Sequence, residues 1–245
     1  MRPAWSGELL VAGCLRPWAE RLIDLVSPQP GECCIDVLSD GPVLARLLRR
    51  AVGSGGRVSV VDDDNETLRA HRGAADVAAS LFGLAHAADP VAMLLMMHGW
   101  LAAHGRLACV VWGGRAGAVH ESAVLDAVAV VTGVRLGFIS TATALGEPGA
   151  AEAVVAAAEM RHSVRVRRLR DVVRFDGIDH LWAALVEQRP EVSAALRACS
   201  GESLHDARCR CAATLAAYTA ADDTLRIPVE AVLIETVADA ISRRR

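Results

Sequence analysis

Aromatic residues and net charge are both scarce in this chain of 245 residues, and each shortage excludes a class of protein. Aromatic residues make up 4% of the chain, while apolar residues, with alanine and valine prominent, make up 53%. This composition excludes intrinsic disorder and favours small, closely packed elements. The formal charge of -3 arises from intermixed acidic and basic residues. It offers no basic stripe for a phosphate backbone, so nucleic-acid binding has no electrostatic support.

Long hydrophobic runs and a regular cysteine pattern are also missing. The longest strongly apolar stretch, residues 90–103, is shorter than the roughly 20 residues that cross a bilayer. Glu8, Arg16 and Pro17 interrupt the place where a secretion signal would carry its apolar core. We therefore expect no membrane crossing and a cytoplasmic location. The seven cysteines have irregular spacing, which favours reduced, mostly buried thiols over a disulfide framework.

Hydrophobic periodicity alternates between short β-type runs and amphipathic helical patterns. Strands are expected at 32–38, 57–62, 76–84, 106–112 and 161–175, and helices at 16–26, 42–52, 65–72, 90–102, 119–132 and 147–160. Gly105 is expected at the exit of the fourth of these helices. Residues 179–221 read as helical with a break at Pro190, and residues 226–238 as a strand, or as a strand followed by a helix. The alternation predicts an α/β fold with a parallel sheet and right-handed crossovers.

The order of these pieces, from about residue 16 to residue 237, resembles the class I S-adenosylmethionine-dependent methyltransferases of the ubiquinone/menaquinone type. Residues 30–64 match the family's first strand, glycine loop, first helix and second strand in order. Residues 80–114 match its fourth strand, the helix that begins at Asp-Pro, the glycine turn and the fifth strand. Residues 144–148 and 223–237 also have family counterparts. The resemblance implies a Rossmann-like, mostly parallel sheet with an antiparallel C-terminal strand, helices on both faces, and S-adenosylmethionine as cofactor.

On this resemblance the chain forms a single domain of residues 1–245. Residues 1–30 would be an N-terminal helical segment, 31–175 the Rossmann-like core, 176–222 a helical cover, and 223–245 a C-terminal strand and tail. The interval between Asp62 and Asp76 holds only one short helix. The family places its third strand and the residue facing the adenine ring there, so we expect the usual edge strand to be missing.

The loop after the first strand departs from the family pattern. The family has an acidic residue followed by small residues spaced two apart, because the backbone passes close to the methionine part of the cofactor. Asp36 supplies the acidic residue, but Leu38 would obstruct that approach and Pro42 removes a backbone donor. Asp40 would repel the ligand's own carboxylate, by about 1 to 4 kcal/mol at about 4 Å. Alternatively, Asp40 caps the next helix and Pro42 lies in its first turn.

The resemblance carries the cofactor role onto five residues. A reshaped S-adenosylmethionine site would be lined by Asp36, Ser39, Gly41, Asp62 and Phe82. Asp62 would accept hydrogen bonds from the ribose hydroxyls. An alternative reading makes Asp62 part of an acidic helix start that complements the helix dipole.

His86 is the candidate acid/base residue, because it follows the fourth family strand at the expected mouth of the pocket. A loop histidine without function is the alternative. His205, Cys209 and Cys211 form an H-x3-C-x-C pattern that could hold a metal. However, C-x-C points its side chains apart on a helix, so we expect no metal site there.

Three functions remain open from the sequence. The first is a non-methylating, methyltransferase-like protein that acts as a partner subunit or as a small-molecule binding protein. The second is an active S-adenosylmethionine-dependent methyltransferase acting on a small molecule. The third is a cofactor-free cyclase or rearrangement enzyme that uses His86. Loss of the third strand would leave residues 57–62 at the sheet edge with unpaired backbone groups, so we also expect a homo-oligomer, or a hetero-oligomer with an active methyltransferase.

Overall fold

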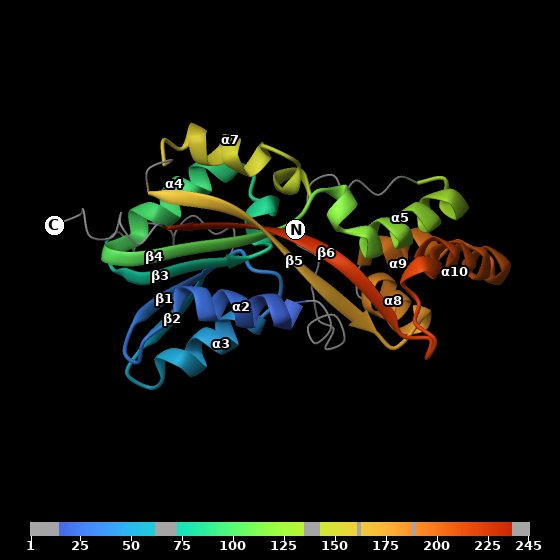
Figure 1. The fold of residues 1–245 in the computed structure, drawn as a ribbon, viewed down its shortest axis with the longest axis horizontal. Coiled ribbons are helices and arrows are strands. Elements are labelled where there is room, and N and C mark those ends of the chain that lie inside the picture. Colours follow the sequence, from blue (N-terminus) through green and yellow to red (C-terminus); the bar gives the residue numbers. More distant parts are fainter. Residues whose placement is uncertain (1–14, 62–72, 135–142, 161–162, 188–189, 237–245) are drawn as a thin grey trace.

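The computed structural model describes residues 15–61, 73–134, 143–160, 163–187 and 190–236. Within them, six strands form one sheet in the order β2-β1-β3-β4-β6-β5 (Figure 1). The strands are β1 (Cys33–Val37), β2 (Arg57–Val61), β3 (Ala75–Leu81), β4 (Leu101–Trp112), β5 (Val164–Phe175) and β6 (Leu225–Thr236). The first four run parallel, and β6 runs antiparallel to both β4 and β5. The predicted mostly parallel sheet with an antiparallel C-terminal strand is confirmed.

Helices cover both faces of the sheet, and each face has its own hydrophobic cluster. One face carries α2 (Arg16–Val26), α3 (Val43–Val52) and α5 (Val119–Thr132), and the other carries α4 (Pro90–Trp100) and α7 (Ala150–Ala157). Alternate residues of one strand enter opposite clusters, as Val77 and Ala78 of β3 do. This alternation follows from the period of two in an extended chain.

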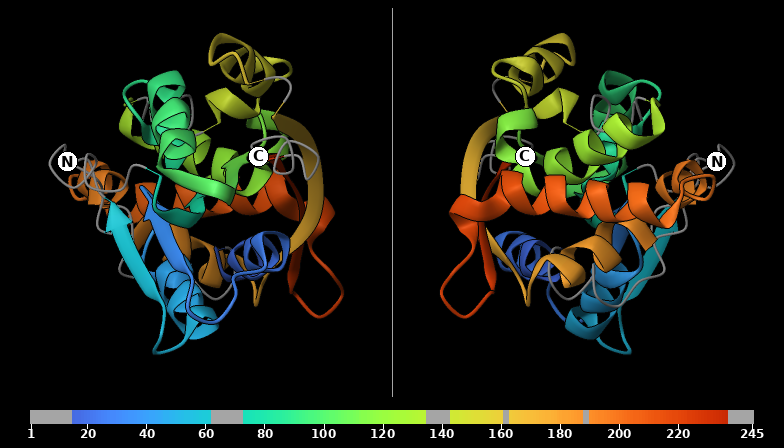
Figure 2. Two further views of the ribbon diagram at one scale, coloured as in Figure 1. Left: turned by 90° about the vertical axis from the view of Figure 1, so that its left-hand side faces the viewer. Right: turned by 90° about the vertical axis from the view of Figure 1, so that its right-hand side faces the viewer.

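A group of helices lies beyond the carboxyl ends of the parallel strands and packs against α5 (Figures 1 and 2). It consists of α8 (Ile178–Trp182), the π-helical turn η6 (Ala183–Glu187), α9 (Pro190–Leu196) and α10 (Gly201–Leu215). The 3-10 turns are η3 (Gly83–His86), η4 (Arg115–Gly117), η5 (Ala144–Gly146) and η7 (Ala216–Tyr218). The predicted break at Pro190 coincides with the start of α9, since proline is tolerated at a first helical turn.

The start of β4 differs from the expectation for Gly105. The chain passes from α4 directly into the strand at Leu101, so Gly105 lies inside β4 and does not end the helix. The pairing of β3 with β4 shifts register between Ala75 and Val77 at this point. A Cβ on Gly105 would come within 2.7 Å of the Ala75 carbonyl oxygen. The glycine is therefore needed for a close backbone approach at an irregular strand pair.

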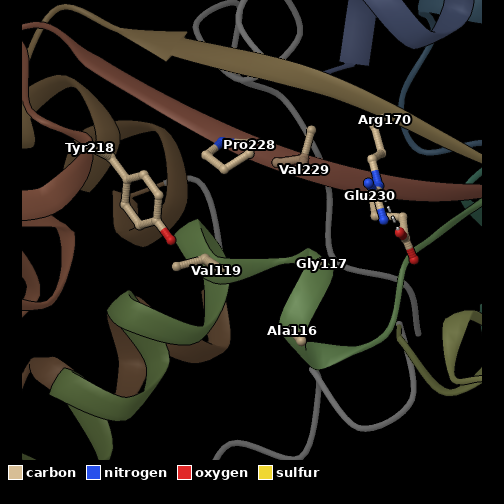
Figure 3. A pocket seen from close by; sticks show the side chains of 8 residues that line it. All are labelled: Ala116, Gly117, Val119, Arg170, Tyr218, Pro228, Val229 and Glu230. Carbon is tan, nitrogen blue, oxygen red and sulfur yellow. Dashed lines mark hydrogen bonds and ion pairs between the residues drawn. The ribbon is translucent and has the colours of Figure 1, made fainter.

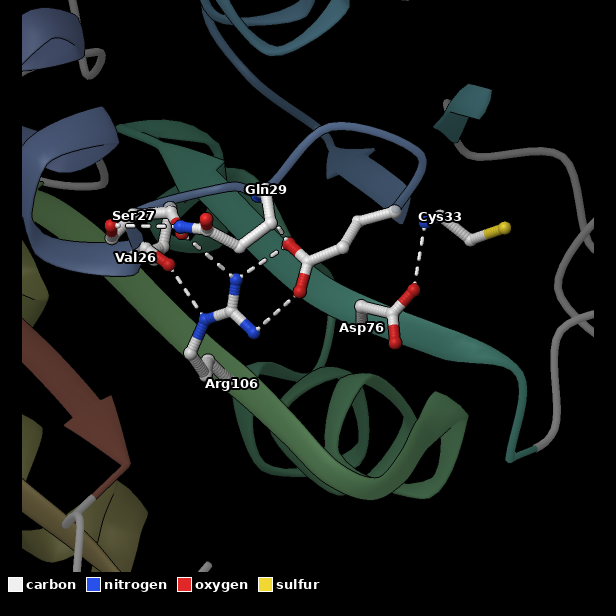
Figure 4. A network of polar contacts seen from close by, with 7 residues as sticks. Val26, Ser27, Gln29, Cys33, Asp76 and Arg106 are labelled. Carbon is white, nitrogen blue, oxygen red and sulfur yellow. Dashed lines mark hydrogen bonds and ion pairs between the residues drawn. The ribbon is translucent and has the colours of Figure 1, made fainter. Parts of the chain in front are cut away.

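Arg106 of β4 joins the carboxyl end of α2 to Glu32, the residue before β1, through one guanidinium group (Figure 4). Its Nε donates to the Val26 carbonyl oxygen at 2.6 Å, at the end of α2. Its Nη1 and Nη2 donate to the two carboxylate oxygens of Glu32 at 3.0 and 2.7 Å. Partial burial acts to raise the pKa of Glu32, but the Arg106 bonds and a bond from the Gln29 amide hold that pKa below its ordinary value.

Strand β2 has β1 as its neighbour within the described ranges, and lies at the edge of the sheet there. The predicted helix at 65–72, and Asp62 with it, fall outside the described residues. Among the helices that the structure describes, none combines the length and apolarity that a membrane crossing requires.

Candidate functional site at the carboxyl edge of the sheet

The loop of residues 38–42, which the resemblance assigns to the cofactor, is tied to strands on both of its sides. The Leu38 amide donates to the Val61 carbonyl oxygen at 2.9 Å, at the end of β2. The Asp40 amide donates to the Leu81 carbonyl oxygen at 2.9 Å, at the end of β3. The Leu81 amide in turn donates to Ser39 Oγ at 2.8 Å. The Leu38 and Asp40 amides therefore already have acceptors within the protein.

Leu38 has a left-handed backbone conformation, with a φ of 54°, and is only 2% exposed. Residues with a Cβ rarely adopt this conformation, which burial and hydrogen bonding hold in place here. Its carbonyl oxygen would lie 1.8 Å from a Cβ built on Gly83, so the loop backbone and the turn after β3 are in direct contact. Gly41 also has a positive φ, of 71°, which suits a glycine.

Asp40 is buried and lies beside His86, with 3.9 Å between Asp40 Oδ1 and His86 Nε2. The N-cap residue of the next helix, α3, is Pro42, so Asp40 lies two positions before the cap. The Asp40 carboxylate is also near the histidine that η3 presents at the same edge.

Two further residues that the resemblance assigns to the cofactor, Asp36 and Phe82, are both buried. Asp36 is buried within β1, in register with Val60 of β2 and Ala79 of β3. Phe82 follows β3, but its ring stacks on Trp112 with centroids 3.9 Å apart and is fully buried. Ser39 and Gly41 thus lie in the loop at the edge, and His86 lies beside Asp40 of that loop, while the Phe82 ring belongs to the core.

A cavity of about 260 Å³ opens at the carboxyl end of β4, between the first residue of α5 and strand β6 (Figure 3). Apolar groups and a single ion-pair network form its lining. The lining residues are Ala116, Gly117, Val119, Arg170, Tyr218, Pro228, Val229 and Glu230.

One carboxylate in this lining is shared by two arginines. Glu230 Oε1 lies 2.6 Å from Arg168 Nη1, and Glu230 Oε2 lies 3.5 Å from Arg170 Nε. In Figure 3 the Tyr218 hydroxyl points toward Val119, with Pro228 and Val229 on the neighbouring strand.

Sequence reasoning did not single out Arg170, Tyr218 or Glu230. Tyr218 is the only tyrosine of the chain and comes just before the last predicted strand. This position was the one feature of the sequence that could have pointed to it. Arg170 and Glu230 lie on two strands far apart in the sequence. Their contact depends on the β5–β6 register, in which they face each other.

The H-x3-C-x-C pattern is divided between two faces of α10. Cys209 Sγ lies 3.4 Å from His205 Nε2 on the exposed side of α10, whereas Cys211 is buried on another face. Burial raises the pKa of the Cys211 thiol to about 12. No group of three or more His, Cys, Asp and Glu side chains that could hold a metal occurs in the described part of the chain. The expectation that C-x-C diverges on a helix is confirmed.

Comparison with known proteins gives matches at the level of structure only. No protein-family profile matches the chain, and no curated protein sequence matches it. A protein of Anabaena variabilis, assigned as a methyltransferase from an antibiotic biosynthesis pathway, superposes with a TM-score of 0.58 at 12% identity, over 92% of this chain and 98% of that one.

A second similar structure is phosphoethanolamine N-methyltransferase 2 of Haemonchus contortus, solved with phosphomonomethylethanolamine and S-adenosylhomocysteine. It superposes with a TM-score of 0.50 at 13% identity, over 90% of this chain and 52% of that one. The likeness at these identities concerns the fold. It agrees with the strand order and with the antiparallel β6 described above. The chain therefore has the Rossmann-like fold of the class I S-adenosylmethionine-dependent methyltransferases, as the order of its sequence motifs predicted.

Proposed function

We propose that this chain is a non-methylating protein on the methyltransferase fold, one that does not hold S-adenosylmethionine in the usual way. It would serve as a partner subunit or as a small-molecule binding protein. The observation that carries the proposal is the structure of the loop 38–42. The side chains of Leu38 and Asp40 are buried in it, and the amides of both residues donate hydrogen bonds to the strands on either side.

Space is the first argument. A methyl donor at this loop would need the backbone to be approachable, which small residues permit. Leu38 is buried there, and its backbone is in contact with Gly83. Of the loop's backbone donors, the Leu38 and Asp40 amides are engaged by strand carbonyls, and Pro42 has none.

Charge is the second argument. The methionine part of the cofactor carries a carboxylate, and the loop already holds the buried carboxylate of Asp40. Two like charges at about 4 Å repel by about 1 to 4 kcal/mol, depending on the effective dielectric. His86 Nε2 lies 3.9 Å from Asp40 Oδ1, so a proton on this imidazole would face the protein's own carboxylate.

The second candidate is an active S-adenosylmethionine-dependent methyltransferase. It is favoured by Asp36, which keeps the acidic residue at the end of the first strand, and by a fold shared with a methyltransferase bound to S-adenosylhomocysteine. Methyl transfer needs mainly alignment of nucleophile and methyl group, so no fixed catalytic motif distinguishes the two candidates.

Calorimetric titration separates them. We expect no heat of binding from S-adenosylmethionine or S-adenosylhomocysteine at concentrations up to about 1 mM, which corresponds to a binding free energy weaker than about -4 kcal/mol. The double variant Leu38→Gly, Asp40→Gly removes both the obstructing side chain and the competing carboxylate, and should bind more tightly than the wild type. Micromolar binding to the wild type, lost in Asp62→Ala, would instead support the methyltransferase.

A further inference from the structure

The cavity beside β6 offers an apolar surface of limited size. Val119, Pro228 and Val229 supply aliphatic walls, and Tyr218 supplies an aromatic one. The volume is about 260 Å³, and an apolar cavity of about 150 Å³ accommodates benzene. The space therefore suits one ring, or a short aliphatic body, together with one polar group.

The charges at one end of this cavity do not balance. Glu230 is the only carboxylate among the lining residues, and it faces two guanidinium groups. Arg168 lies closer, at 2.6 Å, and also donates to the Gly146 carbonyl oxygen at 3.0 Å, which fixes its position. Arg170 is 3.5 Å from Glu230 and its side chain is 87% exposed, so this second contact is weak.

Carboxylates near the cavity are engaged elsewhere. Asp171, next to Arg170 in β5, lies 3.6 Å from Arg21 and accepts a bond from the Val172 amide at 2.7 Å. Glu147 accepts a bond from the Arg115 amide at 2.8 Å and does not line the cavity. One positive charge, that of Arg170, is therefore available to a ligand in the cavity.

We propose that this cavity binds a small carboxylate with an apolar body. The guanidinium of Arg170 holds the carboxylate, and the body packs between Tyr218 and the aliphatic walls. A guanidinium matches a carboxylate in geometry as well as in charge. One available positive charge fits a monoanion better than a phosphate ester, which carries about two negative charges. This inference goes beyond the proposed function, because it stands whether or not the first loop binds S-adenosylmethionine.

The single tyrosine makes the site directly observable. Protein labelled with 3-fluorotyrosine should give one fluorine resonance, from Tyr218 at the cavity wall. Titration with benzoate should shift this resonance saturably, with a Kd of about 1 mM or below. Benzyl alcohol, which has the ring without the charge, should bind roughly tenfold more weakly, because a charge-assisted hydrogen bond is lost. Benzylamine, with the opposite charge, should not bind.

Two arginine variants provide the matched comparison. Arg170→Gln should weaken benzoate binding roughly tenfold while leaving benzyl alcohol binding unchanged. Arg174→Gln removes another exposed arginine of β5 that does not line the cavity, and should leave both affinities unchanged. Thermal unfolding of each variant checks that the fold is intact.

The proposal is overturned if about 10 mM benzoate leaves the fluorine resonance unshifted, since this is tenfold above the expected Kd. Equal affinity for benzoate and benzyl alcohol, or unchanged benzoate binding in Arg170→Gln, also contradicts it. These readouts do not involve S-adenosylmethionine, so their failure is distinct from a failure of the proposed function.

Discussion

At the scale of single residues, the contact between Gly83 and Leu38 is the tightest constraint at the carboxyl edge. A Cβ on Gly83 would meet backbone atoms of Leu38, which cannot move away without displacing the loop. We expect Gly83→Ala to lower the free energy of unfolding by about 2 to 3 kcal/mol, as in overpacked cores. Urea denaturation measures this change.

Gly99 provides the matched control, because it lies in α4 with open space around its Cβ position. Gly99→Ala should raise the free energy of unfolding by about 0.5 to 1 kcal/mol, since alanine is the better helix former. Equal effects of the two substitutions would show that the contact with Leu38 is not a steric constraint.

Buried thiols make stability depend on pH in the alkaline range. Burial raises the pKa of Cys109 and of Cys211 from an ordinary value of 9.0 to about 12. The unfolded chain therefore loses these protons at lower pH than the folded one. The stabilisation is complete below pH 9 and is lost as pH rises toward 12, by about 1.4 kcal/mol per pH unit for each thiol. The chain has no lysine and one tyrosine, so most other groups that titrate in this window are the remaining five of its seven cysteines. Among them, burial raises the pKa of Cys34 to about 12 as well.

Urea denaturation at several pH values between about 8 and 10.5 tests this prediction. Cys109→Ala should reduce the slope of the unfolding free energy against pH by the contribution of one thiol. Cys209→Ala, which removes an exposed thiol, should leave the slope unchanged. An unaltered slope in the Cys109 variant would contradict the assignment.

At the scale of helices and strands, Arg106 is expected to contribute more than a surface arginine does. Its bonds to Val26 and Glu32 are partly buried and join α2, β1 and β4. Arg106→Gln should lower the free energy of unfolding by about 2 to 3 kcal/mol, because charge-assisted bonds are lost. Arg115→Gln, which breaks an exposed pair with Asp126, should cost less than about 1 kcal/mol.

The pH dependence of the Arg106 effect has a defined sign. Because the pKa of Glu32 is lowered in the folded protein, its contribution is present above the ordinary value of 4.5 and is lost as pH falls through the lowered pKa. The difference between wild type and Arg106→Gln should therefore shrink in acid. If the difference in unfolding free energy stayed constant with pH, the effect of Arg106 would not depend on the ionisation of Glu32.

Most elements could be predicted from the sequence, because their patterns are local. The β-branched runs at 33–37 and 57–61 and the amphipathic pattern at 16–26 became β1, β2 and α2. The beginning of β4 could not be predicted in this way, since the tight approach of Gly105 to Ala75 depends on strand pairing. The same limit applies to the site. Residue types at the loop were readable, but the proximity of Asp40 to His86 and of Arg170 to Glu230 arises only in the folded sheet.

At the scale of the whole molecule, we propose that the β2 edge associates with another chain. Val60 on β2 is 44% exposed, and β2 pairs with β1 on one side within the described residues. Light scattering at high protein concentration should report a dimer, and Val60→Lys should shift it toward monomer, because lysine disfavours edge pairing. Val172→Lys on β5, a similarly exposed valine, is the control. A monodisperse wild-type monomer would contradict the proposal.

The hydrogen bonds between the loop 38–42 and its neighbouring strands also determine how often the loop opens. The Leu38 and Asp40 amides are bonded to the ends of β2 and β3, so they should exchange with heavy water as slowly as strand interiors do. A ligand that had to enter beneath this loop would wait for those rare openings. Amide hydrogen exchange measured by mass spectrometry at peptide resolution would show whether the loop stays protected or opens slowly.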